Sequence, residues 1–181
     1  MNVCLIVGHN RKSSGAYDKI LGMSENKFAR LVCAHLLESG IDVDVLTRRY
    51  VEGRQYSSEM AEEIALINAG SYDLCIEIHF NASEDPKSRG CEVLAFHKSE
   101  KGKQYGRLFC KHLNELTGIP IRRGDGILEI TSTKQNGGYG IINSKPCYIL
   151  IESHFSSNEE DSKSMSPYIV GEVIRRIIDG K

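Results

Sequence analysis

The sequence lacks three features that would each point to a particular class of protein. It has no excess of charge, with 23 Lys and Arg against 24 Asp and Glu in 181 residues, which argues against a nucleic-acid partner held by bulk charge. It has no uninterrupted apolar run of the roughly 20 residues that cross a bilayer, so we expect no membrane insertion. No glycine-rich phosphate-binding motif follows the first apolar run, which argues against a nucleotide-binding protein.

The N-terminus and the cysteines lack further signals. Met1–His9 is apolar, without the basic start and small-residue cleavage site of a signal peptide, so we expect a protein made in the cytoplasm. The six cysteines include no CxxC pair, and Cys4, Cys75 and Cys147 lie in apolar runs. We therefore expect reduced, buried thiols rather than disulfides or a cysteine metal site.

Strand-like apolar runs alternate with longer helical patterns, which predicts a single α/β domain over residues 1–181. The predicted strands are Val3–Val7, Ile41–Leu46, Leu74–His79, Cys91–Phe96 and Tyr148–Glu152. The predicted helices are Glu25–Glu38, Ser58–Ala69, Lys103–Thr117 and Pro167–Ile178, the first with Ser24 as its N-cap. The stretch Pro120–Gly140 breaks the alternation, and we expect a long irregular excursion there with at most one short strand.

Ionisable side chains follow or end three predicted strands. His9 comes just after the first strand, His79 ends the Leu74–His79 strand, and Glu152 ends the last one. The carboxyl ends of parallel strands gather along one edge of an α/β sheet, where ligands bind. Two histidines and a carboxylate at that edge indicate either a metal site or an acid/base pair.

Glu25 joins them from the first predicted helix. Phe28, Val32 and Leu36 follow it on one apolar face, which places its carboxylate on or beside a buried stripe. The alternative is that the Glu25 carboxylate only interacts favourably with the positive N-terminal end of the helix dipole. Two histidines, one carboxylate and an open position form a common catalytic zinc shell, but the spacings match no compact motif. From the residues alone, a metallohydrolase is one interpretation.

Four blocks in the same order resemble the zinc-dependent N-acetylmuramoyl-L-alanine amidases, a family shared by bacterial cell-separation amidases and phage endolysins. The blocks are Gly8-His9, Ser24-Glu25-Asn26, Glu77–Ala82 and Leu150–Asn158, with Thr47-Arg48 after the second strand. Each block is weak alone, but together they extend the resemblance over nearly the whole chain.

The resemblance implies one zinc ion held by His9, Glu25 and His79, with Glu152 as the catalytic carboxylate. It also implies a zinc-carboxypeptidase-like fold, a mostly parallel twisted sheet of about six strands with helices on both faces. The implied substrate is bacterial peptidoglycan, cleaved at the amide between N-acetylmuramic acid and L-alanine. A related alternative is a carboxypeptidase-like or aminoacylase-like zinc hydrolase that acts on another amide.

Four residues are weaker candidates for substrate binding. Asn81 could bind substrate, orient a ligand or cap its strand, and Arg122 and Arg123 could pair with stem carboxylates or form a solvated loop. His154 departs from the family pattern, and we expect it to lie exposed beside the cleft. The alternatives are that it contacts substrate or acts as an extra metal ligand. We expect Glu77 to be buried and hydrogen-bonded rather than catalytic.

Between Phe80 and Ile151 there is little room for the helical plug that covers the metal in regulated family members. We therefore expect an open site that needs no obligatory protein partner, which suits a lytic enzyme. A phage endolysin would match the missing signal peptide, since it collects in the host cytoplasm and acts on the wall after release.

Overall fold

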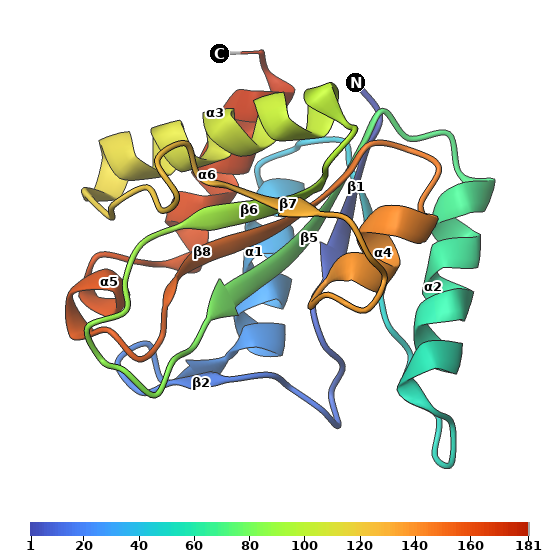
Figure 1. The fold of residues 1–181 in the computed structure, drawn as a ribbon, viewed down its shortest axis with the longest axis horizontal. Helices are drawn as coiled ribbons and strands as arrows, with labels where there is room; N and C mark the ends of the chain where they lie inside the picture. The colour runs from blue at the N-terminus through green and yellow to red at the C-terminus, as the bar shows by residue number, and fades with distance from the viewer. Residues whose placement is uncertain (181) are drawn as a thin grey trace.

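Six strands form the central sheet of the computed structural model, which describes residues 1–180 (Figure 1). In spatial order they are β4 (Asp44–Thr47), β1 (Val3–Val7), β5 (Leu74–Asn81), β8 (Tyr148–Phe155), β6 (Glu92–Phe96) and β7 (Ile127–Ile130). The first four run parallel, β6 is antiparallel to β8, and β7 is parallel to β6. The predicted α/β class and the mostly parallel sheet are confirmed.

Helices cover both faces of the sheet (Figure 1). One face packs against α1 (Glu25–Glu38), α3 (Glu100–Thr117) and α6 (Pro167–Ile178), and the other against α2 (Tyr56–Ala69) and α4 (Gly138–Asn143). Alternate residues of each central strand pack on opposite faces of the sheet. Ile76 and Ile78 lie on the face covered by α1, α3 and α6, and Cys75 lies on the face covered by α2 and α4. Burial on both faces explains why these strands read as continuous apolar runs.

Helix α1 begins as the sequence predicts, and its start places a site residue. The Ser24 hydroxyl accepts a hydrogen bond from Lys27 N at 3.4 Å, which caps the helix. Phe28, Val32 and Leu36 are buried on the face that meets the sheet. Because Glu25 is one turn before Phe28, the same packing brings its carboxylate down to the sheet edge.

The stretch Pro120–Gly140 contains one short strand, β7, as predicted. Helix α4 begins within its last residues, at Gly138, and was not predicted from the sequence. Its six residues are too few to show a helical period, and its start has no side-chain cap. A second short helix, α5 (Glu159–Lys163), was missed for the same reason of length.

Five of the six cysteines are buried, as predicted, and the exception is Cys147. Cys4, Cys33, Cys75, Cys91 and Cys110 are buried free thiols, Cys147 is partly buried, and residues 1–180 contain no disulfide. Burial raises the pKa of Cys33 to about 12, which favours the protonated thiol at neutral pH. Among the described helices, none combines the length and the apolar character that a membrane crossing requires.

A two-stranded hairpin, β2 (Tyr17–Asp18) and β3 (Met23–Ser24), leads directly into α1. Asp18 organises it: Oδ1 accepts hydrogen bonds from Ile20 N at 2.8 Å and Leu21 N at 2.9 Å. Its Oδ2 lies 3.1 Å from Nε2 of His154 on β8, and both side chains are fully buried. The pair therefore ties the hairpin to the sheet and fixes the entry of α1.

We predict that Asp18→Asn weakens this connection in a pH-dependent way. Burial raises the pKa of Asp18, but hydrogen bonds from His154 and Leu21 outweigh burial and hold the pKa below its ordinary value of 3.8. A lowered folded-state pKa means that the stabilisation is present above about pH 4 and is lost as pH falls through the folded pKa.

The expected loss at pH 7 is roughly 1.5–3 kcal/mol in the free energy of unfolding, shrinking at pH 3. Urea denaturation at both pH values measures it, with Glu84→Gln on the surface as the control. An equal loss at pH 7 and pH 3 would contradict the ionic contribution of Asp18.

Candidate metal centre

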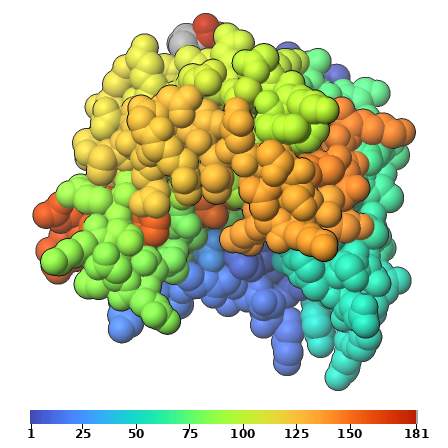
Figure 2. Space-filling view, viewed as in Figure 1, coloured from blue at the N-terminus to red at the C-terminus, as the bar shows by residue number. Residues whose placement is uncertain are grey.

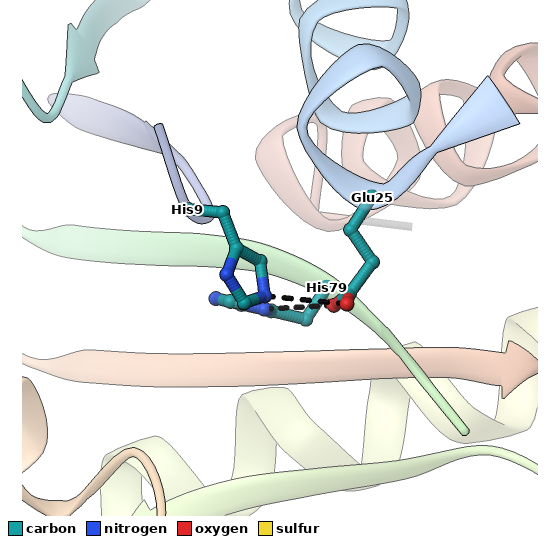
Figure 3. A group of neighbouring side chains, drawn as sticks. All are labelled: His9, Glu25 and His79. Carbon is teal, nitrogen blue, oxygen red and sulfur yellow. Dashed lines mark hydrogen bonds and ion pairs between the residues drawn. The ribbon is translucent and has the colours of Figure 1, made fainter. Parts of the chain in front are cut away.

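Four candidate residues from four elements meet at the carboxyl edge of the sheet. His9 follows β1, Glu25 is the first residue of α1, His79 lies on β5 and Glu152 on β8. Figure 3 shows the His9 and His79 rings turned toward the Glu25 carboxylate. The predicted convergence of residues distant in the sequence is thus present in the structure.

The Glu25 carboxylate lies between the two imidazoles. Its Oε1 is 3.0 Å from Nδ1 of His79, and its Oε2 is 3.2 Å from Nε2 of His9. One ligand atom from each residue lies within 4.8 Å of the others, as a shared metal ion requires. Tetrahedral zinc with bonds of about 2.1 Å separates its ligands by about 3.4 Å, so the spacing and the nitrogen/oxygen donor set both fit zinc.

The backbone around His9 is held in an unusual conformation. His9 has φ 62°, in the left-handed region that a side chain other than glycine rarely adopts. The chain therefore leaves the extended conformation of β1 at His9. Gly8 allows close packing there, because a Cβ at Gly8 would lie 2.5 Å from His79 Nε2 and 2.5 Å from the Ile78 carbonyl oxygen.

The protonation of the cluster follows from burial and pairing. Burial raises the pKa of Glu25, but hydrogen bonds with His79 and His9 outweigh it and lower the pKa to about 2. Burial lowers the pKa of His79, yet the charge of Glu77 and the hydrogen bonds with Glu25 and Glu77 raise it well above 6.5. The cluster thus concentrates negative charge around two imidazoles, which favours a bound cation.

Glu152 is buried beside this cluster with an unsatisfied oxygen. It is the register partner of His79 on β5 and of Glu92 on β6, and only 8% of it is exposed. Its Oε2 has no hydrogen-bond partner within residues 1–180. Burial raises the pKa of Glu152 to about 8, with the charges of Glu25 and Glu92 adding to the shift against the opposing effect of His79. A cation bound nearby would favour the ionised carboxylate.

A cavity of about 500 Å³ opens onto all four residues. In Figure 2 the surface is hollowed between the orange segment around α4 and the blue N-terminal segment. Several wall residues could not be found from the sequence. They come from α2, from the loop before α4 and from α4 itself: Tyr56, Met60, Thr133, Lys134, Gln135, Asn136 and Tyr139. Arg48 also lines it, and the only sequence signal was its place after the second predicted strand.

Three of the four substrate-binding candidates gather around Glu92. Asn81 lines the cavity and donates a hydrogen bond from Nδ2 to Glu92 Oε1 at 3.1 Å. Arg122 Nε lies 3.2 Å from Glu92 Oε1, and Arg123 pairs with Glu92 Oε2. Neither arginine is among the residues that line the cavity. Both guanidinium groups instead pair with the buried Glu92 carboxylate beside the site.

The expectation that His154 lies exposed beside the cleft is wrong. Its side chain is fully buried, its Nε2 faces Asp18, and its ring lies against Phe28 and Phe80 with centroids 5.5 and 4.8 Å away. Nothing in the sequence around His154 indicates that this histidine pairs with Asp18. His154 therefore has no surface for substrate and holds the hairpin instead.

Comparison with known proteins places the chain among cell-wall amidases. Residues 3–180 match the family described as N-acetylmuramoyl-L-alanine amidase. The catalytic domain of the CD27L endolysin targeting Clostridia Difficile is 28% identical, with a TM-score of 0.78 and coverage of 100% of this chain and 98% of that one. Comparison with curated proteins gives no match.

More distant solved structures share the fold. The CwlD amidase from Clostridioides difficile, solved in complex with the GerS lipoprotein, is 17% identical with a TM-score of 0.73 and coverage of 99% of both chains. The N-acetylmuramyl-L-alanine amidase Ami1 from Mycobacterium smegmatis is 19% identical with a TM-score of 0.73, covering 99% of this chain and 95% of that one.

We predict that Gly8→Ala disrupts the centre more than the fold. The added methyl group would press on the His79 ring and on backbone, and we expect at least a tenfold loss of zinc affinity together with about 1–3 kcal/mol of stability. Chelator competition and thermal unfolding measure the two effects.

Gly40→Ala is the control, since a Cβ there meets no atom of residues 1–180 within 4 Å. Its φ of 74° makes it cost about 1–2 kcal/mol of stability, without loss of zinc affinity. Equal zinc affinity in both variants would show that Gly8 does not shape the centre.

Proposed function

Because this chain belongs to the N-acetylmuramoyl-L-alanine amidase family, we propose that His9, Glu25 and His79 hold a zinc ion and that Glu152 moves the proton during amide hydrolysis. One observation carries this proposal. A buried carboxylate with an unsatisfied oxygen lies in the same cavity as three ligand atoms that converge within 4.8 Å.

Zinc at this site would polarise the scissile carbonyl and lower the pKa of a water molecule toward neutrality. The chain's own residues then set the geometry. Glu25 is held by Ala16 N, which donates a hydrogen bond to Oε2 at 2.7 Å, and by Phe80 N, which lies 3.3 Å from Oε1. Backbone donors therefore preorganise the Glu25 carboxylate.

Glu152 is placed to act as general base and then as general acid. Its buried position favours proton uptake from the attacking water, and its free oxygen has no competing donor in the described chain. The same proton can pass to the amide nitrogen as the bond to L-alanine breaks. Asn81 and Glu92 lie on the adjacent strands, where Asn81 donates a hydrogen bond to Glu92, the register partner of Glu152.

We infer that peptidoglycan enters this cavity without displacement of a plug. Helix α4 and the loop before it form one wall, and the cavity still reaches the four site residues. We therefore propose a lytic enzyme, an endolysin or its catalytic domain, that acts on the wall after release from the cytoplasm and needs no protein partner. The similarity to the CD27L catalytic domain supports this proposal.

We predict that Glu152→Gln abolishes hydrolysis but leaves zinc in place. Loss of the proton shuttle should lower the release of stem peptides from purified sacculi by about 10²–10⁴-fold. Mass spectrometry of the digest measures the stems that begin with L-alanine, and elemental analysis measures zinc per chain.

Glu63→Gln, another buried glutamate, is the control and should keep full activity. More than a tenth of the wild-type activity in Glu152→Gln would rule out Glu152 as the essential base. Loss of zinc from that variant would instead make Glu152 a ligand.

The open cavity predicts activity without an activator. Protein stripped by a chelator should be inactive, and one equivalent of zinc should restore stem release from sacculi with no second protein present. If hydrolysis appears only after a lysate fraction is added, the partner-free proposal is wrong, whereas zinc dependence would be unaffected.

A further inference from the structure

We propose that Glu77 is a positioning residue that fixes the tautomer and orientation of His79 for metal binding through Nδ1. This inference rests on the proposed zinc site and adds a residue to it. The side chains of Glu77 and His79 emerge from the same face of β5, two residues apart. Both line the cavity, so the pair belongs to the site and not to the core alone.

The two ring nitrogens of His79 face two different carboxylates. Nε2 lies 3.0 Å from Glu77 Oε1, and Nδ1 lies 3.0 Å from Glu25 Oε1. When Nε2 carries the proton and donates it to Glu77, the Nδ1 lone pair points toward Glu25 and His9. Glu77 therefore selects the nitrogen that joins the three-residue cluster.

Glu77 is itself held in place from behind. Its Oε2 accepts a hydrogen bond from the Tyr148 hydroxyl at 2.8 Å, and both residues are buried. A Cβ at Gly140 would lie 2.9 Å from the Tyr148 hydroxyl oxygen, so α4 packs closely against the phenol. The chain of contacts from α4 through Tyr148 and Glu77 to His79 leaves the imidazole little freedom to rotate.

A purely structural ion pair would not need this arrangement. Burying a carboxylate beside a histidine is often no better for stability than apolar packing, so stability alone is a weak reason for it. Partners of metal-binding histidines, by contrast, orient the ring and increase its basicity, and their loss typically costs about 10–100-fold in metal affinity.

The test measures zinc affinity by chelator competition in wild type, Glu77→Ala, Glu77→Gln and Tyr148→Phe. We expect a loss of about 10–100-fold in Glu77→Ala. Glu77→Gln should fall between that variant and wild type, because its amide oxygen can still accept from Nε2. Tyr148→Phe should show a smaller loss, since it removes only the support of Glu77.

Glu63→Gln is the matched control. Glu63 is a buried glutamate on the same side of the sheet, and its Oε1 has no hydrogen-bond partner in the described part of the chain. It should bind zinc as wild type does. A similar loss in Glu63→Gln and Glu77→Ala would assign the effect to general charge or stability and overturn the proposal.

Nitrogen-15 NMR of the zinc-loaded protein measures which nitrogen of the His79 ring carries the proton. This property would not change if Glu77 only stabilised the fold. Wild type should show His79 protonated at Nε2 with a slowly exchanging proton, and Glu77→Ala should lose that protection. Unchanged zinc affinity in Glu77→Ala, or a His79 ring protonated at Nδ1 in wild type, would overturn the inference. If wild type itself binds no zinc, the proposed function fails first, and the two failures are thereby distinguished.

Discussion

The candidate centre depends on one buried carboxylate that is shared by two histidines. Glu25 reaches His9 through one oxygen and His79 through the other, and the low pKa of the carboxylate follows from that double pairing. A buried anion between two bases is costly unless a positive charge accompanies it. The arrangement is therefore suited to a divalent cation, and the rest of the site is built around that charge.

The order of the strands brings the metal-site residues together. The order β4-β1-β5-β8 brings the ends of β1, β5 and β8 together at one edge of the sheet, and the hairpin before α1 carries Glu25 to the same place. Asp18 and His154 hold that hairpin against β8. Stability and function are therefore coupled here, because the contact that orders the hairpin also places a metal ligand.

Much of this could be predicted from the sequence, because the strands are apolar runs and α1 has a clear cap and stripe. His9 and His79 could be placed together from the strand ends, and Glu25 from the apolar face of α1 and the family resemblance. The pairing of Arg122 and Arg123 with Glu92 depends on contacts between distant segments that local pattern does not encode. The burial of His154 depends on Asp18, 136 residues earlier, for the same reason.

Zinc K-edge X-ray absorption of the purified protein reports directly which side chains bind the metal. We predict one zinc ion per chain with two imidazole nitrogens and a carboxylate oxygen among its ligands, and a spectrum that loses one imidazole in His79→Ala. A protein that takes up no zinc, or whose zinc keeps the same ligands after His79 is replaced, would contradict a metal centre built on His9, Glu25 and His79.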